Sequence, residues 1–429
     1  MLSPSDAALA ARDRAIPGLG LLLDPDALGA AIEGGGVALS GLTIDYVRYK
    51  PGRNCLSRFT ATAGPGREPL TGYAKAYRAD EGVKLEKARQ RETTPGPAGV
   101  GRLVLPEWLI EVCFLPNDNK LRQLRRLANP RAIDRLSRHL LPAGMEWDGG
   151  PLTALNYKPE RRYVARLDTV ESGPAILRFY SESEYRPERA QLAERISPGV
   201  RVPRQLGRYD RRQALAFEWL PGRSLDRLGR GAPESLAALE AAGAMLAEFH
   251  ASLPAEGLGA AVAPHGRPID ATRDMLSALM PAAGLRVERA AGALRRALSW
   301  SAPAMGLIHG DLHTRQIILD GGGVGLIDLD ECRPGDIHFD LGMLLAHFER
   351  DALEPGGDPD LARALGERFL RGYLSAGGRV DDQRLEAQRA ACLFGLLAHY
   401  FRRRDPDWPG RIARGLERVE LLASAGAVA

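Results

Sequence analysis

The segments His309-Gly310-Asp311-Leu312-His313 and Ile327-Asp328-Leu329-Asp330 decide the prediction of the fold. Asp311 and Asp328 each follow a short apolar run. Such a run is typical of a buried strand that delivers a carboxylate to a cleft. A glycine-rich segment, residues 320–323, lies between them and predicts a hairpin turn. Two carboxylates delivered in this way suit a site that takes a proton from a hydroxyl group and holds a divalent metal ion.

Length and composition indicate a globular protein of two or three compact units. The chain has 429 residues, of which 45% are hydrophobic and 26% charged, and its net charge is +4. This charge is small for the length, and no long run of like charges is present, so we expect no nucleic-acid partner. The longest arginine run, residues 402–404, is typical of a solvated helix face, although it could attract an anionic ligand.

The cysteines and the apolar segments exclude several other classes. The four cysteines are far apart and form no Cys-x-x-Cys pair, so neither a zinc site nor a disulfide framework is expected. The N-terminus has no basic segment ahead of an apolar run, and no stretch of about 18 apolar residues occurs. We therefore expect no membrane span and a cytoplasmic location.

The first half of the chain contains an internal repeat. Tyr49-Lys50-Pro51-Gly52-Arg53 is echoed by Tyr157-Lys158-Pro159-Glu160-Arg161. Each copy continues with a strand, a second strand rich in aromatic residues, a charged helix and a strand that ends in Leu-Pro. These elements are predicted at residues 55–62, 72–78, 81–92 and 110–116, and at residues 163–169, 175–180, 187–196 and 214–221. The alternative is two unrelated α+β segments that share a Tyr-Lys-Pro triplet.

The second half is mainly helical. Residues 233–253, 361–376 and 384–402 carry apolar side chains at helical spacing. We therefore predict an N-terminal segment (1–40), a first repeat acting as a cap or docking domain (41–145), a second repeat with a hinge (146–222) and a helical lobe (223–429).

Five motifs in order resemble the aminoglycoside phosphotransferase and choline kinase family, whose members have a protein-kinase-like fold. The resemblance as a whole covers roughly residues 151–375. The motifs are Phe217 to Gly222, Phe249-His250, His309 to His313 with Gln316, Ile327-Asp328, and Pro334-Gly335-Asp336 with Phe339-Asp340-Leu341-Gly342. The resemblance implies an α+β fold, with a small antiparallel β lobe and a mainly helical lobe, preceded here by the extra repeat.

The resemblance assigns roles to the acidic residues. Asp311 would accept or orient the proton of a substrate hydroxyl as that hydroxyl attacks the γ-phosphate of ATP. Asp328 would bind Mg2+. Gln316 stands where the family has Asn, and its amide oxygen would be a second metal ligand. The alternatives are a loop or helix-cap aspartate for Asp311, a turn aspartate for Asp328 and a surface glutamine for Gln316.

Neighbouring residues receive supporting roles. His309 would pack and hydrogen-bond beneath the loop, and Asp340 would accept hydrogen bonds from the loop backbone. His313 would either face the substrate or be structural. Asp330 would be a further acidic group near the metal or a solvated turn residue, and His250 a core histidine.

Nucleotide recognition departs from the family pattern. Arg178 aligns with the family lysine that holds the α- and β-phosphates, with Glu188 as its expected partner or else an exposed helix residue. Arg161 would meet phosphates from a turn that lacks a glycine-rich loop. Residues Glu218, Trp219 and Leu220 would offer backbone groups to adenine. Lys75 holds the position of Arg178 in the first repeat.

The sequence therefore predicts an ATP- and Mg2+-dependent phosphotransferase acting on a small-molecule hydroxyl acceptor. More arginine than acid in residues 384–418 favours a neutral or anionic acceptor, such as a sugar or sugar derivative. The oligomeric state is not predicted. The main alternative is a catalytically impaired, kinase-like binding or scaffold protein, because Arg178 and Gln316 are both unusual. A protein kinase is disfavoured because His-Arg-Asp and Asp-Phe-Gly segments are absent.

Overall fold

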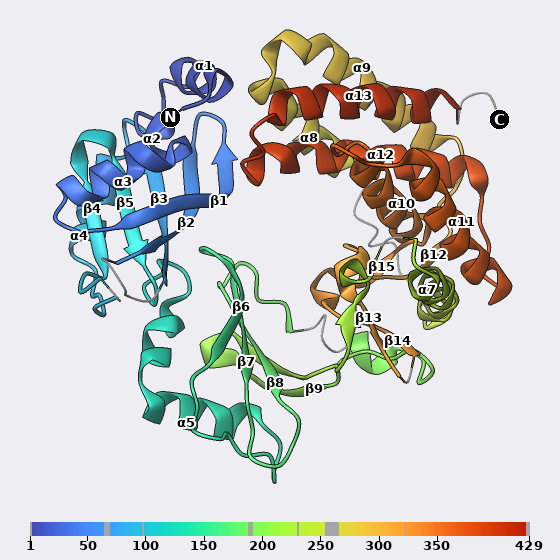
Figure 1. The fold of residues 1–429 in the computed structure, drawn as a ribbon, viewed down its shortest axis with the longest axis horizontal. Helices are drawn as coiled ribbons and strands as arrows, with labels where there is room; N and C mark the ends of the chain where they lie inside the picture. The colour runs from blue at the N-terminus through green and yellow to red at the C-terminus, as the bar shows by residue number, and fades with distance from the viewer. Residues whose placement is uncertain are drawn as a thin grey trace. The chain divides into compact units, whose positions relative to one another are not determined.

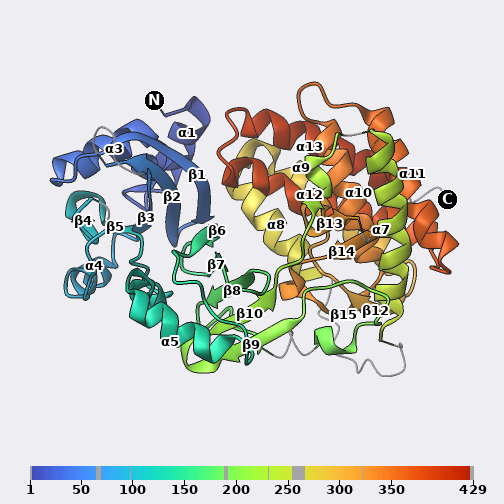
Figure 2. The same cartoon turned by 60° about the horizontal axis from the view of Figure 1, so that its bottom comes forward.

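The computed structural model describes residues 2–63, 69–96, 98–187, 192–229, 231–253, 266–321 and 323–425. The chain forms two compact units, each shown in Figure 1 and Figure 2 and described here by itself. Unit 1 comprises residues 1–185, 205–218 and 399–408, and unit 2 comprises residues 186–204, 219–398 and 409–429. No helix in the described ranges is both long and apolar enough to cross a membrane.

Unit 1 contains two five-stranded antiparallel sheets with the same topology. The strand order is β1-β2-β3-β5-β4 in the first sheet and β6-β7-β8-β10-β9 in the second. The first consists of β1 (Ser40–Lys50), β2 (Asn54–Thr62), β3 (Pro69–Tyr77), β4 (Arg102–Leu105) and β5 (Ile110–Phe114). The second consists of β6 (Thr153–Lys158), β7 (Arg162–Leu167), β8 (Ala175–Tyr180), β9 (Gln205–Tyr209) and β10 (Ala214–Glu218). The two sequence copies therefore have the same strand connectivity.

Each copy also has its own aspartate, which fixes the first hairpin of its sheet. In each copy, one carboxylate oxygen accepts hydrogen bonds from a tyrosine hydroxyl and from the amide three residues later, at 2.7–2.8 Å. The groups are Asp13 with Tyr49 and Gly52, and Asp118 with Tyr157 and Glu160. Both turn residues have a left-handed backbone, with φ of +64° at Gly52 and +59° at Glu160.

A helix precedes each sheet in the same way. Unit 1 begins with α1 (Pro4–Arg12), α2 (Leu19–Leu23) and α3 (Pro25–Gly34). The side chain of Asp24 caps α3, and that of Asn129 caps α5 (Pro130–Leu140), with a proline at the first helical position in both. The structural repeat thus reaches further toward the N-terminus than the Tyr-Lys-Pro motif. The charged helix of the first copy is α4 (Gly82–Arg89).

The two sheets share one apolar core. It joins three residues of the first copy to helix and strand residues of the second. The former are Leu56, Tyr73 and Cys113, and the latter include Leu136, Leu140, Tyr157, Leu177 and Phe179, all less than 9% exposed. The first copy is therefore packed against the second within unit 1.

Unit 2 is mainly helical and contains two small sheets. Its helices are α7 (Pro233–Ala251), α8 (Gly266–Leu279), α9 (Gly284–Ser299), α10 (His338–Ala352), α11 (Pro359–Ser375), most of α12 (Asp382–Arg402) and of α13 (Trp408–Ala425). Figure 2 shows α7 alongside α11. The three predicted helices at 233–253, 361–376 and 384–402 are confirmed as α7, α11 and α12.

The hairpin predicted between Asp311 and Asp328 is present in one of the two small sheets. The strands β11 (Arg223–Ser224), β13 (Ile317–Asp320) and β14 (Gly323–Leu326) form one sheet, and β12 (Met305–Ile308) pairs with β15 (Arg333–Asp336) in the other. The hairpin therefore joins β13 to β14, and the strands ahead of Asp311 and Asp328 belong to different sheets.

Of the helix predicted at 187–196, residues 188–191 lie outside the described ranges, and residues 193–195 form a single 3-10 turn.

Candidate active site

A histidine joins the two acidic segments of unit 2. His309 directly follows β12, and its Nε2 lies 3.0 Å from the carbonyl oxygen of Ile327, the residue before Asp328. A carbonyl only accepts, so Nε2 carries the proton. The Nδ1 atom then accepts from the amide of Asp311 at 3.4 Å. His309 is fully buried and, as a neutral imidazole, fixes the two aspartate segments side by side.

The segment that carries Asp328 is held from its other side as well. The amide of Ile327 donates to the carbonyl oxygen of Gln316 at 3.0 Å. Asp328 itself has φ +67° and ψ +56°, a left-handed conformation that is uncommon for an aspartate. Such strain persists only where the surrounding structure enforces it, and it concentrates at functional sites.

Asp340 on α10 binds the start of the Asp311 loop. Its two carboxylate oxygens accept hydrogen bonds from the amides of His309 at 2.6 Å and Gly310 at 2.9 Å. His250 Nε2 lies 3.2 Å from the same carboxylate, and His250 Nδ1 lies 2.9 Å from the hydroxyl of Tyr373. Burial alone would raise the pKa of Asp340, but the bond from His250 and the loop amides lower it, so the carboxylate is ionised. This is the contact expected for Asp340.

Only glycine fits between His309 and Asp311. Gly310 has φ +84°, and a Cβ atom there would lie 2.4 Å from the carbonyl oxygen of Glu331. The loop backbone thus passes directly against the segment after Asp328, which explains the glycine in physical terms.

Gln316 is buried and already has a partner. Its Oε1 accepts a hydrogen bond from the amide of His313 at 3.1 Å, and the His313 side chain accepts from the Gln316 amide. Together they form a reciprocal cap on the short turn 314–316. An amide oxygen has two lone pairs, so this cap leaves one acceptor position for a metal ion. Asp328 directly follows Ile327, whose amide bonds this turn, and it is the stronger candidate ligand among the described residues.

His313 lies against a second histidine. Its ring contacts that of His347 on α10 in an edge-to-face geometry, with centroids 5.2 Å apart. Burial lowers the pKa of His313 to about 4, so its imidazole is neutral near pH 7. These contacts give His313 a structural role. A role of His313 in binding the substrate stays a prediction.

A buried ion pair beneath the loop escaped the sequence analysis. Asp336, the last residue of β15, accepts hydrogen bonds from Arg384 Nε at 2.6 Å, Gln388 Nε2 at 2.8 Å and His338. Arg384 on α12 is 2% exposed and also donates to the carbonyl oxygen of Leu298 at 3.1 Å. The Pro-Gly-Asp motif signalled Asp336, but no local pattern marks its partner 48 residues away.

The predicted phosphate-binding arginines belong to unit 1. Arg161 forms a two-pronged ion pair with Glu184, with N–O distances of 2.9 and 2.8 Å, so its guanidinium already binds a carboxylate. Arg178 on β8 is 9% exposed, and its guanidinium lies 5.0 Å from the ring centroid of Phe217. Glu188, its expected partner, lies outside the described residues.

The hinge segment begins where β10 ends. Glu218 is the last strand residue, paired with Ala175, and Trp219 and Leu220 follow it into unit 2. Gly222 has φ +130°, and a Cβ atom there would lie 2.2 Å from the carbonyl oxygen of Leu319 on β13. The hinge therefore passes directly over the hairpin that precedes Asp328.

The phosphotransferase enzyme family matches residues 160–387, slightly more than half of the chain. The chain belongs to the phosphotransferase enzyme family. The match starts within the second copy, so the first copy lies outside the matched residues. No curated protein sequence matches the chain.

Several solved structures are similar to this phosphotransferase. An amicoumacin kinase in complex with AMP-PNP and Ca2+ is 16% identical, with 70% of this chain and 95% of that chain covered at a TM-score of 0.50. A choline/ethanolamine kinase family protein from Mesorhizobium loti is 20% identical, with 68% and 94% covered at a TM-score of 0.44. A macrolide 2'-phosphotransferase from Brachybacterium faecium is 21% identical, with 70% and 97% covered at 0.43. The predicted family and kinase-like α+β fold are confirmed.

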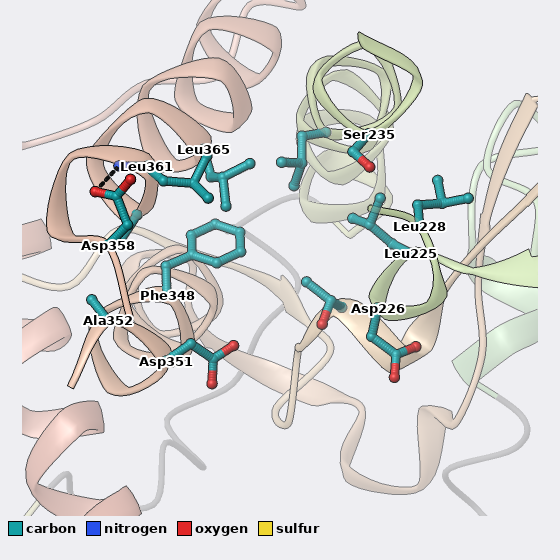
Figure 3. Close-up of a pocket in the computed structure, with 13 residues that line it drawn as sticks. Leu225, Asp226, Leu228, Ser235, Phe348, Asp351, Ala352, Asp358, Leu361 and Leu365 are labelled. Atoms are coloured by element: carbon teal, nitrogen blue, oxygen red, sulfur yellow. Dashed lines mark hydrogen bonds between the residues drawn. The ribbon is translucent and has the colours of Figure 1, made fainter. Parts of the chain in front are cut away.

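A pocket of about 570 Å³, including its open mouth, adjoins the Asp311 loop of the phosphotransferase within unit 2. Thr314 lines it, three residues after Asp311. Figure 3 shows apolar side chains that face one another across it, from α10 and α11 on one side and from the segment after β11 on the other. These are Phe348, Leu361 and Leu365, opposite Leu225 and Leu228.

Three aspartates at the rim of this pocket already have partners. Asp226 lies 3.2 Å from Arg315 Nε, and Asp351 lies 3.0 Å from Arg350 Nη2. Asp358 caps α11 by accepting from the amides of residues 360 and 361. The pocket is therefore apolar where these side chains face one another, and Asp358, whose partners are uncharged amides, keeps its negative charge beside it.

Proposed function

We propose that this phosphotransferase transfers the γ-phosphate of ATP to a hydroxyl group of a neutral, sugar-like small molecule. Two contacts carry the proposal. His309 donates a hydrogen bond to the carbonyl oxygen of Ile327, and Asp340 accepts hydrogen bonds from the backbone of the Asp311 loop. These contacts hold Asp311 and Asp328 at fixed positions, as phosphoryl transfer requires, because its catalysis rests on positioning and charge stabilisation.

In this proposal each aspartate has one task. Asp311, which is exposed, would accept or orient the proton of the acceptor hydroxyl. Asp328, with Gln316, would hold Mg2+, which neutralises charge on the phosphate oxygens when it is bound. Arg178 and the hinge residues Glu218 to Leu220 would bind the nucleotide.

A neutral acceptor is supported by the partners of the C-terminal arginines. The sequence has more arginine than acid in this region. In unit 2, however, four of these arginines on α12 and α13 form ion pairs with buried or half-buried carboxylates. These pairs are Arg384 with Asp336, Arg389 and Arg418 with Glu349, and Arg411 with Glu354. These ion pairs support a neutral acceptor over an anionic one. The apolar base beside Thr314 suits the C–H face of a sugar ring, with its hydroxyl groups directed to the loop.

The test is turnover against a defined panel. The full chain is incubated with ATP, Mg2+ and neutral sugars, amino alcohols or aminoglycosides, and phosphorylated products are detected by mass. We expect transfer to a neutral sugar-like compound and a loss of kcat of about 10²- to 10⁴-fold in Asp311→Asn. Asp274→Asn, at an exposed position of α8, is the matched control. Nucleotide binding without transfer to any class would favour the impaired, kinase-like binding protein instead.

A further inference from the structure

A second pocket lies wholly within unit 1, between α5 and the β8–β10–β9 side of the second sheet. It encloses about 1070 Å³ including its mouth, and Leu127 and Leu136 contribute apolar surface. Phe179 also lines it, and successive residues of a strand point to opposite faces of a sheet. The pocket is therefore on the face opposite to Arg178, and it is distinct from the predicted nucleotide site.

The charge of this pocket is of one sign. Four arginines and a histidine line it, and none of its described lining residues is Asp or Glu. These are Arg126, Arg135, Arg211, Arg212 and His139. The nearest acids in sequence are used elsewhere: Asp134 pairs with Arg138, and Asp210 pairs with Arg208.

The four arginines have no carboxylate partner among the described residues, in contrast to arginines such as Arg161 and Arg384. Like charges gathered around a concave surface repel one another, and the folded state gains nothing from them without a counter-ion. An arginine guanidinium offers a planar fork of donors that matches phosphate oxygens. The gathering is therefore best explained by an anion that binds between them.

One wall of the pocket is already ordered. The ring of His139 stacks on that of Tyr209, with centroids 4.6 Å apart and an interplanar angle of 10°. His139 Nδ1 lies 2.8 Å from the carbonyl oxygen of Arg135, so Nδ1 carries a proton and Nε2 remains for a ligand. The stack links α5 to the end of β9 and gives the pocket a flat, partly apolar side.

We propose that this pocket binds a small phosphorylated organic molecule. The arginines would hold its phosphate group, and the His139–Tyr209 stack with the leucines would contact its carbon skeleton. A concave site with an apolar base suits a small molecule better than an extended polyanion. The inference does not depend on which acceptor the phosphotransferase uses, because none of these residues belongs to the predicted catalytic or nucleotide site.

Calorimetric titration of the full chain tests this site, with glucose 6-phosphate, inorganic phosphate and glucose as separate probes. We expect the sugar phosphate to bind, inorganic phosphate to bind more weakly, and glucose to show no binding that depends on the arginines of this pocket. The double variant Arg135→Gln/Arg212→Gln should lose at least 10-fold in affinity for glucose 6-phosphate. Arg131→Gln, an exposed arginine of the same helix outside the pocket, should bind as the wild type does.

Arg178→Gln separates this site from the nucleotide site. If the double variant binds glucose 6-phosphate as tightly as the wild type, or if affinity falls only in Arg178→Gln, the pocket does not bind phosphate and the proposal is wrong. Equal affinity for inorganic phosphate and the sugar phosphate would also overturn it, because the carbon skeleton would then contribute nothing. Circular dichroism checks that each variant is folded.

Discussion

Lys75 of the first sheet contacts the carboxylate of Glu160 in the second, with its Nζ 2.7 Å from Oε1 and 2.9 Å from Oε2. Arg48 Nη2 lies 2.9 Å from the same carboxylate, whose side chain is only 2% exposed. Burial alone would raise the pKa of Glu160, but Lys75 and Arg48 lower it, so the residue is ionised. The lysine at the Arg178 position of the first copy thus binds the turn that precedes β7.

Lys75→Met should loosen that turn. Glu160 would lose one of two cationic partners while it remains buried in a left-handed conformation, so we expect a loss of about 1–3 kcal/mol in the free energy of unfolding. Under the proposed function, KM for ATP should rise while kcat changes little. Lys84→Met, at an exposed lysine of α4, is the control in urea unfolding and ATP kinetics. An unchanged unfolding midpoint in Lys75→Met would show that Arg48 alone holds Glu160.

Asp340→Asn should damage the Asp311 loop. Asparagine has one acceptor oxygen in place of two, so one of the amides of His309 and Gly310 would be left buried without a partner. We expect a loss of about 2–4 kcal/mol in stability and at least a 10-fold drop in kcat. Tyr373→Phe removes only the hydroxyl bonded to His250 and should cost about 1 kcal/mol with little effect on kcat. Equal effects of the two substitutions would contradict the assigned role of Asp340.

Gln316 should reveal two separable functions. Gln316→Ala removes the cap on the His313 amide, which should cost about 1 kcal/mol in stability. It also removes the proposed second metal ligand, so the Mg2+ concentration needed for half-maximal rate should rise. Gln316→Glu keeps an acceptor at the same reach and should restore the cap while tightening Mg2+ binding. If the Mg2+ dependence is the same in all three proteins, Gln316 is a capping residue only.

The elements that sequence reasoning predicted share a strong local signal. The strand at Ala175 to Tyr180 and the helix at 233–253 have clear apolar patterns, and the structure contains both as β8 and α7. Short motifs also marked Asp340 and His309, because glycine and aspartate at fixed spacing are required by the loop geometry. Each of these signals lies within about ten residues of the element it predicts.

What escaped prediction depends on partners that are distant in the chain. Arg384 meets Asp336 across 48 residues, and Lys75 meets Glu160 across 85. Arginine content in residues 384–418 favoured a neutral or anionic acceptor and did not separate the two, because composition does not show which charges are paired. Composition also did not show that the guanidinium of Arg161 is bonded to Glu184.

The buried pair of Asp336 and Arg384 should make stability depend on acid pH. Burial alone would raise the pKa of Asp336, but the hydrogen bond from His338 and the charge of Arg384 lower it to about 2 from 3.8. The folded-state pKa is therefore below the unfolded one, so this stabilisation is present above about pH 4 and is lost as the pH falls toward 2. Its size is on the order of 2 kcal/mol.

Urea unfolding of the wild type and of Asp336→Asn at pH 7, 5 and 3 measures this contribution. The variant leaves Arg384 buried without a carboxylate at every pH. Its loss in the free energy of unfolding should therefore be largest at pH 7 and 5. The loss should be smaller at pH 3, because the wild-type carboxylate then contributes less to stability. Asp274→Asn, at an exposed position, should differ little from the wild type throughout. A deficit of Asp336→Asn that is the same at all three pH values would mean that the charge of Asp336 contributes no pH-dependent stability.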